Sequence, residues 1–425
     1  MTRIRPFRAL RYDPRRVDLD RVIAPPYDVI APGDRASYFD RDPHNAIRLT
    51  LTREVEQEAT TDYSEIRRTL DAWQTSAVLV RDPSPALYGL RERFVAPDGT
   101  DHARDAFFAL LHLEDYERRI VRPHELTLAG PKADRLKLLR AAGANLSSVL
   151  VLYEDRDREL DRVLAPALDA EPVAEARDPA CSHRLTRMAD RASVEAVCAF
   201  LSERPVVIAD GHHRYETALQ YRDECSRGGD DPSAWMLACF ANAFAPGNLL
   251  LPIHRLILKS AVPTDAAWAE RLPGWTQRSV PIASAEAIPA LLAEHLGPLL
   301  DLHAFAADDA SGRLRIFSKP RSQAAEDDLT VRVVHEDVIA GVFGLDEEAV
   351  REGAIDYPKD ALQTARDLRS GRGSVALYLN PVAPEDVFRV TAAGEVMPQK
   401  STFFYPKLPT GLVFRPLDED GEATS

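Results

Sequence analysis

Residues 206–219, VVIADGHHRYETAL, show most directly which architecture this 425-residue chain adopts. Four apolar residues at 206–209 predict a short buried strand. Gly211 allows a tight turn, and the spacing of Tyr215, Ala218 and Leu219 predicts a helix that begins directly after it. A strand that passes through a glycine turn into a helix is a building unit of α/β proteins, so we expect an α/β fold.

The turn at 210–214 has the composition of an anion-binding site. A helix start presents unpaired N–H groups and a partial positive charge, which suits a phosphate group. Arg214 offers a bidentate contact, and Asp210 can hold Mg²⁺ or orient a hydroxyl. The alternative is structural, with the histidines capping the helix and Asp210 serving as an ordinary N-cap residue. We interpret Asp210 as catalytic and assign phosphate or nucleotide binding to Gly211, His212, His213 and Arg214.

A second candidate segment is PHELTLAGPKADR, residues 123–135. Its loop carries Glu125, a candidate general base for a hydroxyl nucleophile. The Gly-Pro pair at 130–131 predicts a helix start. Lys132 and Arg135 lie three residues apart on that helix, so they share a face and can both reach a phosphate chain. The alternative is a surface helix with a solvated charge cluster.

A third candidate segment is MPQKSTFFYPK, residues 397–407, which holds two of only seven lysines in the chain. Lys400 and Ser401 resemble the end of a P-loop, but Gln399 stands where that motif requires glycine, so a Walker A site is excluded. We interpret Lys400 and Ser401 as phosphate-binding, which requires this segment to fold back onto the N-terminal lobe. The alternative is an aromatic strand with polar neighbours.

Length and composition restrict the class of protein. A chain of this size is expected to form two or three lobes. The net charge of −14 disfavours nucleic acid as a partner. No stretch approaches the ~20 apolar residues that span a bilayer, and the N-terminus lacks the pattern of a signal peptide, so we expect a cytoplasmic protein without a membrane partner. Four widely spaced cysteines without a CxxC pair argue against disulfides and a zinc ribbon.

Periodicity along the chain predicts further elements and the domain division. Helical spacing favours helices at 65–76 and 193–203, and apolar runs favour strands at 86–94, 107–112 and 148–153. We expect a catalytic lobe at 1–256, a second α/β lobe at 257–415 that folds back on the site, and a flexible tail at 416–425. The sequence leaves the oligomeric state open.

Five segments together resemble the bacterial and archaeal family called domain of unknown function 1015. They are PPYDVI at 25–30, NAIRL at 45–49, HELT with KADR within 124–135, ADGHHRYETA at 209–218 and PQKST at 398–402. The resemblance extends from Arg5 to Phe414. The DGHHR string is also similar to the phosphate-binding turn of the ParB/sulfiredoxin fold, some members of which are kinases that phosphorylate free L-serine.

The resemblance implies a ParB/sulfiredoxin-like N-terminal lobe and phosphoryl transfer from ATP or ADP, with Mg²⁺, to a small hydroxyl compound. Free L-serine is the favoured acceptor, Glu125 the activating carboxylate, and Tyr27, Asp28, Arg48 and His124 the substrate-binding residues. This chain is much longer than those kinases, which leaves the acceptor open. A nucleotide-binding switch without kinase activity is the alternative. A sulfiredoxin-like repair enzyme is disfavoured, because His212 occupies the position of its cysteine.

Overall fold

The computed structural model describes residues 1–54, 61–125, 129–225, 231–322 and 328–417. The chain divides into two compact units. The first unit contains residues 1–249 and, from Pro406 on, the C-terminal segment; the second unit is Leu250–Tyr405. The chain thus leaves the first unit seven residues before the expected boundary at 256 and re-enters it at 406 instead of ending the second lobe at 415. Residues 418–425 of the expected tail lie outside the described residues.

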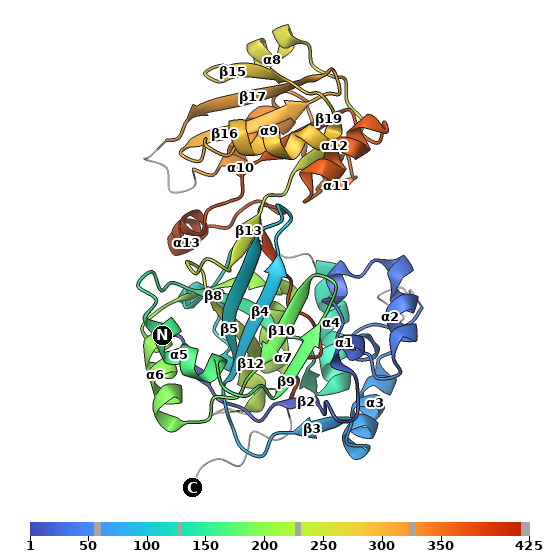
Figure 1. Cartoon of the computed structure of the whole chain (residues 1–425), viewed down its shortest axis with the longest axis vertical. Helices are drawn as coiled ribbons and strands as arrows, with labels where there is room; N and C mark the ends of the chain where they lie inside the picture. The colour runs from blue at the N-terminus through green and yellow to red at the C-terminus, as the bar shows by residue number, and fades with distance from the viewer. Residues whose placement is uncertain (55–60, 126–128, 226–230, 323–327, 418–425) are drawn as a thin grey trace. The chain divides into compact units, whose positions relative to one another are not determined.

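A nine-stranded mixed sheet forms the centre of the first unit (Figure 1). Its strand order is β6-β11-β8-β12-β5-β4-β10-β9, and β1 pairs with β5. The pairs β11–β6 and β12–β8 are parallel, whereas the others are antiparallel, which confirms a mixed α/β architecture. The strands are β1 (Ile4–Arg5), β4 (Tyr88–Val95), β5 (Asp101–His112), β6 (Val121–Pro123), β8 (Val149–Tyr153), β9 (Ala174–Arg177), β10 (Cys181–Leu185), β11 (Val206–Asp210) and β12 (Trp235–Asn242).

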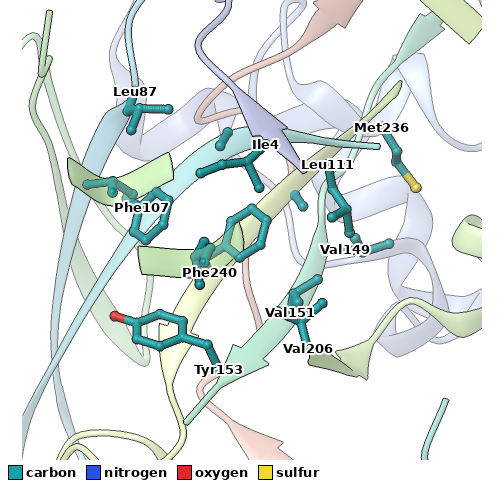
Figure 2. Close-up of a cluster of buried hydrophobic side chains, with 14 of the residues drawn as sticks. Ile4, Leu87, Phe107, Leu111, Val149, Val151, Tyr153, Val206, Met236 and Phe240 are labelled. Atoms are coloured by element: carbon teal, nitrogen blue, oxygen red, sulfur yellow. The ribbon is translucent and has the colours of Figure 1, made fainter. Parts of the chain in front are cut away.

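One hydrophobic cluster of this unit packs on one face of the sheet (Figure 2). Alternate residues of the central strands point into it, and Phe107 of β5 stacks on Phe240 of β12 with ring centroids 5.1 Å apart. Two helices, α5 (Glu159–Leu168) and α6 (Arg191–Ser202), contribute apolar residues to the same cluster. Burial of this apolar surface, at about 25 cal/mol per Å², is what fixes the sheet to its helices.

The remaining elements of the first unit complete its surface and edges. Two short antiparallel pairs, β2 with β3 and β7 with β21, involve segments distant in sequence. Their bounds, with the other helices, are β2 (Leu10–Tyr12), α1 (Leu19–Val22), η1 (Tyr27–Val29), η2 (Pro32–Asp34), α2 (Arg35–Arg41), η3 (Ala46–Leu49), α3 (Ser64–Thr75), β3 (Leu79–Arg81), η4 (Tyr116–Arg118), α4 (Ala129–Ala142), β7 (Ala144–Asn145), α7 (His212–Cys225), η5 (Pro232–Ala234) and β21 (Arg415–Pro416).

The second unit is also α/β. Its six-stranded antiparallel sheet has the order β15-β17-β16-β19-β14-β18, and Phe305 stacks on Phe317 at 4.7 Å beside the buried Trp268. A two-stranded ribbon joins β13 and β20. The bounds are β13 (Leu249–Leu251), β14 (Arg255–Ile257), α8 (Asp265–Arg271), β15 (Thr276–Pro281), η6 (Ala285–Ala287), α9 (Ile288–His295), β16 (Leu302–Asp308), β17 (Arg313–Pro320), α10 (Thr330–Val334), η7 (His335–Ala340), α11 (Glu347–Arg351), β18 (Ile355–Asp356), α12 (Ala361–Arg369), β19 (Val375–Leu379), α13 (Pro384–Ala393) and β20 (Phe403–Tyr405).

The C-terminal segment from Pro406 is bound into the first unit by backbone hydrogen bonds. Leu10 exchanges two bonds with Phe414, and Ala24 exchanges two with Thr410. Within the described residues, no helix is both long and apolar enough to span a membrane.

A buried row of alternating charges crosses β10, β4 and β5, and we call it the charge ladder. His183 lies opposite Glu92, and Glu92 lies opposite Arg104. His183 hydrogen-bonds Glu92 through Nδ1 and Asp178 through Nε2, both at 3.0 Å, and Arg104 Nε donates to Glu92 at 2.7 Å. One atom each of Glu92, His183 and Cys181 that could bind a metal lies within 4.8 Å of the other two, which is close enough to hold a metal ion. Ion pairs nevertheless explain this cluster without a metal. The cations His183 and Arg104 face the carboxylates of Glu92 and Asp178.

The charge ladder predicts a loss of stability at alkaline pH. Burial alone lowers the pKa of His183, but hydrogen bonds to Asp178, Cys181 and Glu92 raise it well above its usual range. Its stabilisation is therefore complete below the unfolded-state pKa of about 6.5 and is lost as pH rises through the folded-state pKa. Urea unfolding between about pH 6 and pH 10 should show this decline, and His183→Gln should flatten it. An equally steep decline in the variant would contradict the assignment.

Candidate functional site

The turn between β11 and α7, residues 210–214, requires a glycine for two reasons. Gly211 has φ +92°, a left-handed value that L residues with a Cβ adopt at a cost. A Cβ there would also lie 2.9 Å from Cζ and Nε of Arg214. The glycine thus permits the guanidinium to lie against the backbone of the turn, next to the start of α7.

Asp210 lies between two cations. Its Oδ2 accepts from Arg214 Nη2 at 2.7 Å, and its Oδ1 accepts from Lys407 Nζ of the C-terminal segment. Burial raises the pKa of this carboxyl, but Lys407 and Arg214 outweigh burial and hold the pKa well below its usual range. Asp210 is therefore ionised, and its single negative charge offsets only one of the two positive charges of Arg214 and Lys407.

One N–H group of Arg214 has no hydrogen-bond acceptor among the residues that the structure describes. Besides Asp210, its Nη1 donates to the carbonyl of Ser148. Its Nε is buried and has no hydrogen-bond partner among the described residues. A buried donor without a partner costs roughly 1–3 kcal/mol, so a ligand oxygen placed beside it would gain from that contact.

His124 and His212 form a buried pair beside the turn. The backbone N–H of His124 donates to Nε2 of His212 at 3.4 Å, and Nδ1 of His124 donates to the carbonyl of Ile208 at 2.6 Å. The rings lie edge to face with centroids 4.6 Å apart. Burial lowers the pKa of both histidines, and the nearby His124 ring lowers the pKa of His212 further. His212 is thus a neutral acceptor that joins β6 to α7, not a cation.

His213 is the more accessible histidine of the turn. It is half-buried, and burial lowers its pKa, whereas Glu216, Glu125 and Asp28 raise it. Glu125 follows β6, the parallel neighbour of β11, which is why the two segments end close together. The structure therefore brings Glu125 to the turn; residues 126–128 of the same segment lie outside the described residues.

Lys132 and Arg135 both have partners. Lys132 Nζ contacts Glu216 at 2.8 Å, which joins α4 to α7. Arg135 is buried, contacts Asp134, and donates to the hydroxyl of Tyr63 at 2.8 Å. Its guanidinium also lies over the Tyr27 ring, 4.1 Å from the centroid. Phosphate binding by these two residues stays a prediction, since each must first release a partner in the described arrangement.

A narrow pocket of about 50 Å³, open to solvent, adjoins the turn. Burial raises the pKa of the Tyr27 hydroxyl, while nearby Arg214 and Arg135 lower it. Tyr27, Arg135 and Arg214 all line the pocket. Arg48 instead donates to the carbonyl of Phe39 at 2.6 Å. The apolar side is formed by Leu138, Leu139, Leu146 and Met236.

Lys400 and Ser401 belong to the second unit, whereas the lysine that reaches the turn is Lys407. Lys400 has φ +59°, and Ser401 donates to the carbonyl of Pro398 at 2.5 Å. The sequence pattern led us to Lys400 and not to Lys407. Lys407 could have been selected, because it is the second lysine of segment 397–407 in a lysine-poor chain.

Comparisons with known proteins give a family and distant structural similarities. A family model described as "Protein of unknown function (DUF1015)" matches residues 4–292. No curated protein matches the sequence. A free serine kinase mutant in complex with AMP is 14% identical, over 73% of this chain and 93% of that chain, with a TM-score of 0.37. SbnI with a C-terminal truncation, from Staphylococcus aureus, is 12% identical over 74% and 90%, with the same TM-score. A conserved hypothetical protein from Pyrococcus furiosus is 13% identical over 73% and 96%, with a TM-score of 0.35.

The geometry of the turn predicts that Gly211→Ala destabilises the chain. The backbone strain and the contact with Arg214 together should cost about 1–3 kcal/mol of unfolding free energy. Gly33→Ala is the matched control, because a Cβ at Gly33 would meet no atom within 4 Å and Gly33 has no left-handed φ. Denaturant unfolding of both variants measures the difference, and equal stabilities would contradict this account.

Proposed function

The chain belongs to the DUF1015 family of proteins of unknown function, and we propose from its site that it is a nucleotide-dependent phosphotransferase. The proposed reaction moves a phosphoryl group from ATP or ADP to a small hydroxyl compound, and free L-serine is the favoured acceptor because of the DGHHR string. The observation that carries the proposal is the pairing of one ionised carboxylate, Asp210, with two cations at the start of α7.

The charges of the turn suit a polyphosphate. The two positive charges of Arg214 and Lys407 outnumber the one negative charge of Asp210. Nε of Arg214 has no hydrogen-bond partner among the described residues. Backbone N–H groups at the start of α7 add donors and a partial positive charge. An arriving phosphate would therefore meet oriented donors without first having to break the Asp210–Arg214 pair.

The adjoining pocket suits the rest of a nucleotide. Pockets for small ligands combine apolar walls with a few polar groups that fix orientation. Here four apolar side chains form one side, and Tyr27 with Arg214 forms the polar side that adjoins the turn. We propose that the nucleoside lies at the solvent-open mouth of this pocket and that its phosphates extend to the turn.

In the proposed mechanism Glu125 accepts the proton of the acceptor hydroxyl. The hydroxyl oxygen then forms a bond to phosphorus, the bond from phosphorus to the bridging oxygen breaks, and the nucleotide leaves one phosphate shorter. Arg214 and Lys407 neutralise the charge of the transferring group, which is the main requirement of this chemistry. Asp210 acts by positioning these two cations, and His213 lies beside Glu125 as a neutral donor.

Mg²⁺ fits the described arrangement poorly. It is usually held by one or two carboxylates together with substrate phosphates. Both oxygens of Asp210 already accept from Arg214 and Lys407, and a divalent cation there would face two like charges. We therefore assign no step to a metal ion.

The test of the activity is a direct assay. The purified chain is incubated with ATP or ADP, with and without Mg²⁺, against a panel of hydroxy amino acids, and phosphate esters are followed by phosphorus NMR. We expect a phosphomonoester of one acceptor. Nucleotide binding without an ester from any acceptor would replace the phosphotransferase with the nucleotide-switch alternative.

Arg214→Ala should weaken nucleotide binding by about 1.5–3 kcal/mol, because a charge-assisted contact and a buried donor are lost together. Isothermal titration with ADP measures this change. Arg140→Ala is the control, since Arg140 pairs with Glu224 on the surface. An unchanged affinity of the Arg214 variant would remove the turn from the nucleotide site.

Glu125→Gln should reduce turnover by ~10²–10⁴-fold while nucleotide affinity stays the same. The amide keeps the shape of the side chain but cannot accept the proton. Glu224→Gln, which alters a surface ion pair, is the control. A Glu125 variant with full turnover and a lower melting temperature would show that this residue is structural.

A further inference from the structure

The strands β9, β10 and β4 are neighbours in the large sheet (Figure 1). Residues of these strands line a second cleft. Its volume is about 540 Å³, it is open to solvent, and four arginines line it. None of its lining residues belongs to the turn at 210–214 or to the pocket beside it. The register of the strands arranges the four arginines in two rows, and the rows differ in charge balance.

The first row is neutralised by its own neighbours. Arg184 of β10 lies opposite Arg91 of β4 and opposite Glu175 of β9. Arg91 contacts Asp105 at 2.7 Å and Asp169 at 2.6 Å. Arg184 contacts Glu175 at 3.5 Å and also donates to two backbone carbonyls. These two arginines therefore serve as structural cations.

The second row is not neutralised. Ser182 of β10 lies opposite Arg93 of β4 on one side and opposite Arg177 of β9 on the other. Neither Arg93 nor Arg177 has a carboxylate partner among the described residues. Asp20, an acid of the cleft lining, accepts from the backbone N–H of Arg177 at 2.6 Å. Neighbouring strands lie about 4.8 Å apart, so the backbones of Arg93 and Arg177 lie about 10 Å apart on either side of Ser182.

Such a row presents two exposed guanidinium groups that need not release a carboxylate of the described residues before an anion binds. An anion between the two guanidinium groups could accept hydrogen bonds from both. The Ser182 hydroxyl donates to the backbone carbonyl of Arg93 at 3.4 Å, so it would have to rotate to donate to the anion. Arginine forks match the oxygens of phosphate in a bidentate manner.

We propose that Arg93, Ser182 and Arg177 form a second anion-binding site that takes a small phosphate-bearing ligand. The site is separate from the β11–α7 turn and does not depend on the phosphotransferase activity. Its neutralised first row holds the strands in place, and its second row supplies the charge for binding.

The test is isothermal titration of inorganic pyrophosphate into the full chain. We expect a binding event that persists in Arg214→Ala, in which the other phosphate site is weakened. Arg93→Ala/Arg177→Ala should weaken this event about tenfold or more, because two charge-assisted contacts are lost. Arg162→Ala/Arg191→Ala removes two exposed charges from helices α5 and α6 of the same unit and should leave the binding unchanged.

A second variant keeps the test independent of charge removal. Ser182→Asp places a carboxylate between the two arginines, so it should raise the melting temperature and abolish pyrophosphate binding. The proposal is overturned if Arg93→Ala/Arg177→Ala binds pyrophosphate as native protein does, if both double variants lose affinity equally, or if Ser182→Asp leaves binding intact.

Discussion

The pairing of Asp210 with Arg214 and Lys407 joins three parts of the first unit at one carboxylate. Asp210 ends β11, Arg214 lies in the first turn of α7, and Lys407 comes from the segment that re-enters the unit after residue 405. Removing one partner of a buried pair leaves an uncompensated charge and costs roughly 3–5 kcal/mol. The shape of the proposed phosphate site therefore depends on this contact.

The charge ladder supports the same contact through the C-terminal segment. Arg104 donates to Glu92 and also, at 2.9 Å, to the carbonyl of Pro406, the residue before Lys407. The ladder thus holds the backbone of the C-terminal segment where it begins, and the next side chain reaches Asp210. Gly247 adds a constraint, because a Cβ there would overlap the backbone of β5 at Ala103, next to Arg104.

Local patterns were sufficient for much of the fold. The strand at 206–209, the helix after Gly211, and the helices expected at 65–76 and 193–203 agree with β11, α7, α3 and α6 to within two residues at each end. The strand expected at 107–112 is longer, because its polar half at 101–106 is fixed by pairing with β4 and not by its own apolar pattern. The site was harder to predict, because it depends on contacts between residues far apart in the sequence. Local spacing does not indicate that Lys407, and not Lys400, contacts Asp210. It also does not indicate that His212 is a neutral hydrogen-bond acceptor.

The central claim is that the β11–α7 turn holds the phosphates of a nucleotide, and a crystal structure of the chain with ADP tests it most directly. The account predicts phosphate oxygens about 3 Å from Nε of Arg214 and from backbone N–H groups at the start of α7, with the nucleoside at the mouth of the pocket beside Tyr27. Phosphates bound away from Arg214 and Lys407, with the Asp210 contacts unchanged, would contradict it.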